Sequence, residues 1–303
     1  MYDIIIIGAG PAGLTAAIYG VRAGKKVLVL EAKSYGGQII NVLKIDNYPA
    51  LPHVSGVEYA TTLYEQALEL GAEIKFEKAI DMLIEDNKKI ITTTKEKYEA
   101  KAVIIATGND KRKLRLENEE KLEGKGISYC ATCDGMFYKD KDVAVVGGGD
   151  TALDDAMYLS DIVNKVYLIH RREEFRGIEN VLEELKKKNN VEIITNTYVT
   201  KLIGEENLEA IETMNNEGNA NRIEVSGLFV AIGQVPETGN LIKEINTNSQ
   251  GYVEAGEDTK TNIEGVFVAG DVRTKELRQL TTAAADGSMA AVNACKYIRE
   301  LNN

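Results

Sequence analysis

A dinucleotide-binding fingerprint at the start of the chain constrains its fold more than any other feature. Residues 4–7 form a short apolar run, the motif GAGPAG follows at residues 8–13, and a second apolar run at residues 27–30 ends at Glu31. The stretch between the motif and the second run has a helical pattern. This strand–turn–helix–strand order is the context that such a motif needs to bind a dinucleotide, and it predicts buried parallel strands.

The same unit recurs in the middle of the chain. An apolar run at residues 143–146 leads into GGGDTA at residues 147–152, and a further run at residues 166–169 is followed by His170. The interval from the first glycine to the residue that ends the second strand is identical in the two copies. One glycine motif is weak evidence, because ordinary tight turns in an α/β sheet also use glycine. Two copies in the same context favour two nucleotide-binding units.

The glycines of these motifs have separate mechanical purposes. The first permits the tight turn, the second lets a pyrophosphate approach the backbone, and the third brings the helix against the strand. The N-terminus of the helix then stabilises the phosphate charge. The sequence therefore predicts a pyrophosphate at each of the two turns.

The residue at the end of the second strand distinguishes the two sites. Glu31 would accept hydrogen bonds from free ribose hydroxyls and repel a 2′-phosphate, which suits FAD or NAD. In the second copy, His170 is followed by Arg171, Arg172 and Arg176. Guanidinium groups pair with phosphate through charge and a bidentate fork, so this cluster favours NADPH. A solvated basic stretch is the alternative, but the cluster falls where the fingerprint recognises the ribose.

Later segments complete the first predicted sheet. Residues 102–108 form a buried strand that ends in a tight turn, and residues 266–271 form another that ends in an aspartate. Ligands in open α/β sheets bind beyond such strand ends. An alanine-rich helix is predicted over residues 278–297. Its N-terminus would offer a positive dipole to an anionic reduced flavin, and plain core packing is the alternative role of the helix.

Two of the three cysteines form the motif CATC at residues 130–133. A structural zinc site would need two further ligands, but the chain has no second CxxC and only two histidines, His53 and His170. We therefore expect no metal. A structural disulfide is typical of oxidising compartments. The remaining interpretation is a redox-active pair, which fits a chain with two nucleotide sites.

The residues around the pair suit thiol–disulfide exchange. That reaction needs a thiolate attacker and a second thiol that can resolve the mixed disulfide, and two intervening residues allow both. Asp134 directly follows Cys133 and would move a proton to the departing sulfur, with a helix-capping role as the alternative. Cys295 lies inside the predicted alanine-rich helix, where we expect a small buried side chain.

Length and charge exclude several other classes. A chain of 303 residues suits two domains. The net charge of -11 argues against nucleic-acid binding and against an anionic membrane surface. No apolar run approaches the length of a membrane-spanning helix. The chain opens without a basic leader, so a cytoplasmic location is expected.

Seven motifs together carry a resemblance to a known family. In chain order they are GAGPAG, GGQI at residues 36–39, CATCDG, GGGDTA, HRREEFR, VAIG at residues 230–233, and VAGDV followed by RQL. The chain closely resembles the bacterial low-molecular-weight thioredoxin reductases over essentially its whole length. The combination of CATCDG with HRRxxxR is highly specific.

The resemblance implies an α/β fold of two Rossmann-like, three-layer nucleotide-binding domains in a protein that works as a homodimer. The FAD domain would be discontinuous and consist of residues 1–113 and 241–303. The NADPH domain would carry the cysteine pair and be inserted as residues 114–240. The junctions would therefore lie near Lys113-Leu114 and Gly239-Asn240.

The resemblance also assigns residues to sites. The FAD pyrophosphate would be held by Gly8, Gly10, Pro11 and Ala12, and the adenosine ribose by Glu31. The rest of the FAD site would be lined by Gly37, Gln38, Asn47, Thr107, Gly108, Asp271, Arg278, Gln279 and Leu280. NADPH would contact Gly148, Asp150, Thr151, His170, Arg171, Arg172 and Arg176. Cys133 would face the flavin, Cys130 would attack a protein disulfide, and Asp134 would be the acid–base residue.

The implied reaction passes electrons from NADPH to FAD, then to the Cys130–Cys133 disulfide, and finally to thioredoxin or a similar small redox protein. Rotation of the domains would separate the two half-reactions. Ferredoxin-dependent or oxygen-using relatives lack the HRRxxxR arginines, and ferredoxin or flavodoxin NADP reductases lack the cysteine pair. This chain has both features, and a non-catalytic flavin-binding module would need neither.

Overall fold

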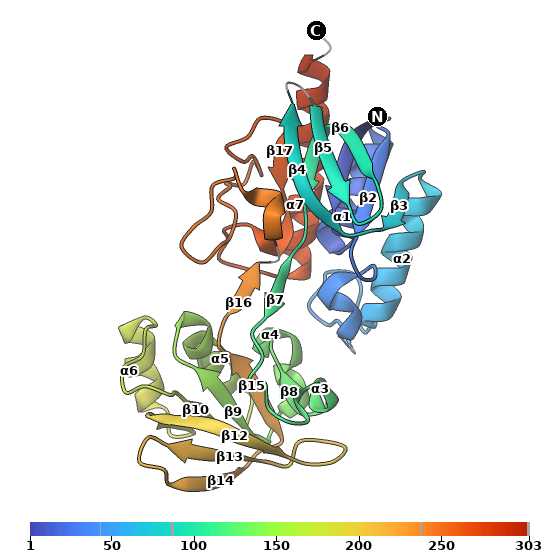
Figure 1. Ribbon diagram of the computed structural model, residues 1–303. Coiled ribbons are helices and arrows are strands. Elements are labelled where there is room, and N and C mark those ends of the chain that lie inside the picture. Colours follow the sequence, from blue (N-terminus) through green and yellow to red (C-terminus); the bar gives the residue numbers. More distant parts are fainter. Residues whose placement is uncertain (43, 86–87, 237, 302–303) are drawn as a thin grey trace. The chain divides into compact units, whose positions relative to one another are not determined.

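The computed structural model describes residues 1–42, 44–85, 88–236 and 238–301, and the chain forms two compact units (Figure 1). The first unit consists of Met1–Asp110 together with Val235–Asn303, and the second of Lys111–Gln234. The second unit is therefore an insertion in the sequence of the first. The sequence-based junctions near Lys113-Leu114 and Gly239-Asn240 remain predictions of the functional domain limits.

The first unit is built on a sheet with the strand order β3-β2-β1-β6-β5-β4, and β17 also pairs with β6. The parallel strands are β1 (Tyr2–Ile7), β2 (Val27–Glu31), β3 (Glu73–Phe76), β6 (Lys97–Ile105) and β17 (Val266–Val268). An antiparallel meander continues the sheet through β4 (Ala79–Glu85) and β5 (Lys88–Thr93). The parallel strands confirm the predicted apolar runs.

Both faces of this sheet are covered, which explains why its central strands are apolar without alternation. Ile4 and Ile6 pack on one face with α1 (Pro11–Arg22) and α7 (Leu280–Leu301), whereas Ile5 and Ile7 pack on the other with segments that include Val253. The helix α2 (Gly56–Glu69) packs against α1. The first unit also contains three short 3-10 helices, which are η1 (Gly37–Asn41), η3 (Gly239–Ile242) and η4 (Gly270–Val272).

The second unit has a parallel sheet with the order β11-β10-β9-β15-β8. Its strands are β8 (Ile127–Ser128), β9 (Asp142–Gly147), β10 (Lys165–Ile169), β11 (Val191–Ile194) and β15 (Gly227–Ala231). A separate antiparallel sheet contains β12 (Thr197–Ile203), β13 (Ala210–Asn215) and β14 (Ala220–Glu224). The helices are α3 (Glu119–Leu122), α4 (Ala131–Asp134), η2 (Gly135–Tyr138), α5 (Asp150–Ser160) and α6 (Glu179–Lys187).

The two segments that connect the units pair with each other. They are β7 (Asn109–Lys111) and β16 (Gln234–Pro236), which form a two-stranded sheet. Each unit thus has its own parallel sheet. In the first unit a glycine turn connects β1 to α1, and in the second a glycine turn connects β9 to α5. This arrangement confirms the predicted α/β class with two Rossmann-like units.

The long C-terminal helix differs from its predicted bounds. It begins at Leu280 rather than Arg278 and continues to Leu301. The Arg278 side chain lies before the helix and donates to the carbonyl oxygens of Asp271 and Arg273, which fixes the chain just ahead of the first turn. Within the described residues, no helix combines the length and the apolar character that crossing a membrane requires.

Candidate functional site

Two glycines of the first turn, Gly8 and Gly13, cannot be replaced by larger residues without a shift of the backbone. Gly8 has a φ of +112°, and a Cβ atom added there would lie 2.3 Å from the carbonyl oxygen of Ala106. A Cβ atom added to Gly13 would lie 1.9 Å from the carbonyl oxygen of Gly8. Pro11 is the first residue of α1, where its missing N–H costs nothing. The turn therefore brings the N-terminus of α1 close to the strand ends, as an anion site needs.

Glu31 is fixed beside this turn at the end of β2. One carboxylate oxygen accepts a hydrogen bond from the backbone N–H of Ala9 at 2.8 Å, and the other accepts from the N–H of Lys33 at 2.7 Å. The carboxylate is thus tied to the glycine turn itself. An acid in this place favours ribose hydroxyls and disfavours an additional phosphate.

Two buried polar atoms mark the carboxyl ends of neighbouring strands. Thr107 follows β6, Asp271 lies in η4 after β17, and these two strands pair in parallel. Thr107 Oγ1 and Asp271 Oδ1 are buried and have no hydrogen-bond partner among the described residues. Burial raises the pKa of Asp271, although the charges of Lys275 and Arg278 lower it. Unsatisfied buried groups are rare, so these two atoms fit the hydroxyl groups of a bound cofactor.

Other residues predicted for FAD lie in the same unit, and several of their side chains have partners there. Gln38 donates from Nε2 to the carbonyl oxygen of Asn109 at 2.5 Å, and Asn47 donates to Oε1 of Gln279 at 3.0 Å. Arg278 stacks its guanidinium 4.1 Å from the ring centroid of Tyr252. Gly37 and Gly108 have left-handed backbones with φ of 58° and 70°, and Leu280 is the first residue of α7. The FAD role of these residues stays a prediction.

A buried ion network, which the sequence reasoning missed, supports the Asp271 turn. Asp286 of α7 accepts hydrogen bonds from Arg273 at 2.8 Å through both carboxylate oxygens, from Lys275 at 2.6 Å and from the backbone N–H of Gly270 at 2.9 Å. All three charged side chains are at least nine-tenths buried. The available signal was Asp286, an acidic residue inside the alanine-rich stretch predicted as a helix.

The second glycine turn is also closely packed. A Cβ atom added to Gly147 would lie 2.3 Å from the carbonyl oxygen of Ala231. The three arginines predicted for the 2′-phosphate follow β10 in one loop and are exposed. No described residue forms an ion pair with Arg171, Arg172 or Arg176, so their charges are available to an anion. Thr151 is exposed in the first turn of α5.

The cysteine pair forms a disulfide, with the two Cα atoms 5.3 Å apart. Cys130 precedes the short helix α4 and Cys133 lies within it. Both cysteines are half-buried, and their backbone is tied by a hydrogen bond from the N–H of Cys133 to the carbonyl oxygen of Cys130. In the described part of the chain, no group of three or more potential ligands is arranged to hold a metal. The two sulfurs are close enough to form and break a bond with each other, as dithiol–disulfide exchange requires.

Asp134 lies beside the disulfide and is held by Ser128, a residue that the sequence reasoning did not single out. The Ser128 hydroxyl donates to Asp134 Oδ2 at 2.6 Å, and its oxygen accepts from the N–H of Cys130 at 3.1 Å. Burial raises the pKa of Asp134, whereas Ser128 and the charge of Lys111 act in the opposite direction. A carboxyl group with a raised pKa is suited to giving a proton to a sulfur.

Cys295 has no part in this site. It lies in α7 of the first unit, where it is half-buried and packs beside the core that was expected to bury it. Burial raises the pKa of its thiol, which lowers the fraction of reactive thiolate.

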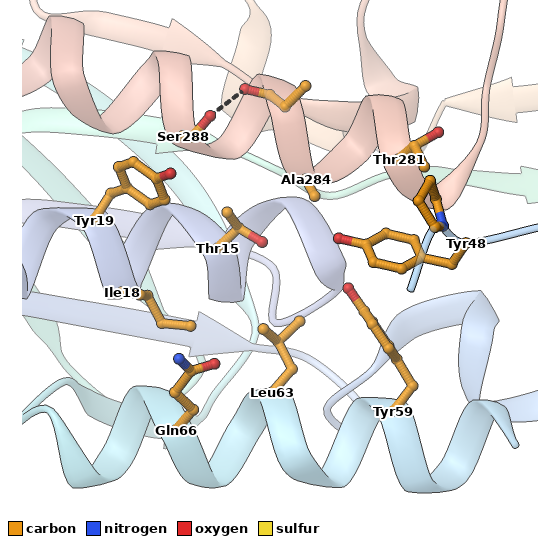
Figure 2. Close-up of a pocket in the computed structure, with 12 residues that line it drawn as sticks. Thr15, Ile18, Tyr19, Tyr48, Tyr59, Leu63, Gln66, Thr281, Ala284 and Ser288 are labelled. Atoms are coloured by element: carbon orange, nitrogen blue, oxygen red, sulfur yellow. Dashed lines mark hydrogen bonds between the residues drawn. The ribbon is translucent and has the colours of Figure 1, made fainter. Parts of the chain in front are cut away.

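A groove of about 510 Å³ lies between α1, α2 and α7 (Figure 2). Tyr19 and Thr15 line it from α1, Tyr59 from α2, and Ser288 from α7. None of the residues that line it belongs to the predicted FAD set. The groove is thus lined by other residues than those predicted for FAD, although both sets include residues of α1 and α7.

Comparison with known proteins gives consistent results. The family model described as pyridine nucleotide-disulphide oxidoreductase matches residues 2–287. A thioredoxin reductase from Peptoclostridium litorale is 41% identical over 309 residues, covering 99% of this chain and 98% of that protein. The crystal structure of thioredoxin reductase from Streptococcus pyogenes MGAS5005 has a TM-score of 0.94 and 36% identity, with 99% of each chain covered.

A ferredoxin-flavin thioredoxin reductase from Clostridium acetobutylicum is also similar, with 29% identity, a TM-score of 0.54, and 100% of this chain and 99% of that chain covered. Two Rossmann-like units and a closed cysteine pair define a disulfide oxidoreductase of the class that binds flavin and pyridine nucleotide. The chain belongs to the pyridine nucleotide-disulphide oxidoreductase family, and the relatives named above are thioredoxin reductases.

Proposed function

We propose that this protein uses NADPH to reduce thioredoxin or a similar small redox protein through FAD and the Cys130–Cys133 disulfide. The main observation behind the proposal is the closed cysteine pair beside Asp134. The two nucleotide-binding units of the chain also differ in the residues that would recognise the ribose, which follow or end β2 and β10. An acid follows the first turn and an arginine cluster follows the second. Full-length similarity to named thioredoxin reductases supports the same function.

The residues of the first unit fit FAD. The pyrophosphate would be held at the first glycine turn by Gly8, Gly10, Pro11 and Ala12. Glu31, which is fixed beside that turn, would bind the ribose. The unpaired side-chain oxygens of Thr107 and Asp271 would form hydrogen bonds with the cofactor. FAD, when bound, supplies the acceptor of hydride and the donor of electrons to a disulfide. The functional domains would be residues 1–113 with 241–303 for FAD, and residues 114–240 for NADPH.

The exchange step follows from the cysteine pair itself. With the pair reduced, the Cys130 thiolate attacks one sulfur of the substrate disulfide, and the other substrate sulfur leaves with a proton. The Cys133 thiol then loses its proton and attacks Cys130 Sγ, which releases the second substrate thiol and restores the Cys130–Cys133 bond. Asp134 would carry the proton between the departing and attacking sulfurs.

Removing the Asp134 carboxyl is expected to change the pH profile of the reaction. A proton donor works only below its own pKa, and burial raises the pKa of Asp134, so the rate should fall as pH rises through that value. We expect Asp134→Asn to slow disulfide exchange by about 100-fold or more and to remove this fall in rate at high pH. Stopped-flow measurement across pH would show it. The Asp134 side chain makes no helix-capping hydrogen bond, so an unchanged profile would leave it only its contact with Ser128 and would contradict the acid–base role.

The arginine cluster is expected to select NADPH over NADH. Each charge-assisted hydrogen bond is worth about 1.5–3 kcal/mol, so Arg172→Met should weaken NADPH use by about tenfold or more and leave NADH use almost unchanged. Anaerobic flavin bleaching by each nucleotide measures this. Arg222→Met is a matched control, because Arg222 is an exposed arginine of β14 that pairs with Glu224. Equal bleaching by both nucleotides in the unmodified protein would contradict the assignment.

A homodimer in the cytoplasm, with a thioredoxin-like protein as the electron acceptor, completes the proposal. Similarity to a ferredoxin-flavin enzyme makes a ferredoxin-dependent or oxygen-using reaction the second candidate. The exposed arginines favour NADPH. Steady-state NADPH oxidation with a panel of small redox proteins decides between the two, because the second candidate requires no oxidation of NADPH.

A further inference from the structure

His170 is not exposed among the arginines that follow it. It lies at the end of β10 with only 5% of its surface accessible. Its ring faces the second glycine turn so closely that a Cβ atom added to Gly148 would lie 2.1 Å from it. The ring centroid of Phe175, a residue of the following loop, is 4.9 Å from that of His170. The imidazole thus fills the space between the glycine turn and residues 171–178, which we call the arginine loop.

The hydrogen bond of His170 fixes its chemical form. Nε2 lies 3.2 Å from the carbonyl oxygen of Glu174, and a carbonyl oxygen only accepts, so Nε2 carries the proton. Burial lowers the pKa of His170, and the charges of Arg176, Arg171 and Arg172 lower it further, although the Glu174 carbonyl acts the other way. Burial and the neighbouring arginines thus disfavour a positive charge on the ring.

The arginine loop is attached to the glycine turn at two further points. The backbone N–H of Arg176 donates to the carbonyl oxygen of Gly148 at 2.7 Å, and the N–H of Ile178 donates to Asp150 Oδ1 at 2.9 Å. With the hydrogen bond from His170 to Glu174, these contacts fix the loop at three residues along its middle and C-terminal parts. The guanidinium groups of the three arginines remain exposed.

We propose that His170 is a positioning residue for NADPH discrimination: its imidazole holds the arginine loop against the glycine turn, and the three arginines alone contact the 2′-phosphate. This inference rests on the proposed use of NADPH and changes the expected role of His170 from ligand to support. It makes discrimination depend on a hydrogen-bond donor at residue 170 that reaches the Glu174 carbonyl oxygen, and not on a positive charge there.

Binding of 2′,5′-ADP and 5′-AMP, measured by calorimetry, tests the inference without turnover. His170→Ala should weaken 2′,5′-ADP binding by about tenfold, the equivalent of one hydrogen bond, and affect 5′-AMP much less. Amide hydrogens of the arginine loop should exchange faster in the same variant. His170→Gln keeps an uncharged N–H donor at a similar reach and should restore most of the lost affinity.

Two controls make the outcomes distinct. His53→Gln changes the other histidine, which is exposed and lies in the first unit. Arg172→Met should lose 2′,5′-ADP affinity with unchanged exchange in the loop, as a direct ligand does. If His170→Ala behaved like Arg172→Met, or if His170→Gln restored nothing, the positioning role would be overturned. If the unmodified protein bound both nucleotides equally, this result would contradict the proposed use of NADPH and, with it, the inference.

Discussion

Replacement of Cys133 by serine is expected to stop the reduction of protein disulfides while flavin binding continues. Cys133 forms one half of the Cys130–Cys133 bond, and the residues that fit FAD lie in the other unit of the chain. Without the second sulfur, the mixed disulfide formed at Cys130 cannot be resolved internally. NADPH-dependent reduction of thioredoxin should therefore fall below detection, as followed by the free thiols released.

Cys295→Ser is the matched control for this experiment. Cys295 is the remaining cysteine, and burial raises the pKa of its thiol, so its replacement should leave the reduction rate close to that of the unmodified protein. Retention of thioredoxin reduction by Cys133→Ser would remove the centre of the proposed reaction. Loss of activity in Cys295→Ser would show that the redox chemistry involves a further sulfur.

Replacement of Asp286 by alanine should cause a large loss in the free energy of unfolding of the protein. Arg273 and Lys275 would keep their charges in a buried place without the carboxylate that now pairs with both. Removing one partner of a buried ion pair typically costs about 3–5 kcal/mol in the free energy of unfolding. Gly270, the residue before Asp271, would also lose the acceptor for its N–H, so the affinity for FAD should decrease too.

Urea unfolding of the flavin-free protein measures this loss directly. Asp46→Ala is the control, because Asp46 is an exposed aspartate of the same unit that pairs with Lys44 and His53, and its removal should have a much smaller effect. Burial alone would raise the pKa of Asp286, but the hydrogen bonds from Arg273 and Lys275 hold it below its usual value. The stabilisation is therefore present at neutral pH and is lost as the pH falls through that lowered pKa. Equal stability of both variants would contradict the network's role.

Local sequence patterns were enough to predict the strands and turns that form the two nucleotide sites. The apolar runs before Gly8 and Gly147 become β1 and β9 because a strand covered on both faces must be apolar throughout. The two cysteines are three residues apart, so their pairing was also a local property. The class of fold and the redox pair could therefore be predicted from the sequence.

Tertiary contacts of individual side chains were not predictable in this way. Asp286 reaches Arg273 and Lys275 only because α7 packs across the turn after β17, and no periodicity indicates that partnership. Ser128 contacts Asp134 because β8 ends beside α4. His170 has the sequence position of a ribose ligand, yet the return of the arginine loop onto Gly148 buries it.

The most direct measurement is the redox state of the cysteine pair after anaerobic addition of NADPH to the flavin-loaded protein. Alkylation followed by mass spectrometry would report the thiols at residues 130 and 133. We predict that both become alkylated with NADPH and that neither does so without it. A reduced flavin beside an intact Cys130–Cys133 disulfide, or a protein that takes up no flavin, would contradict the proposed function.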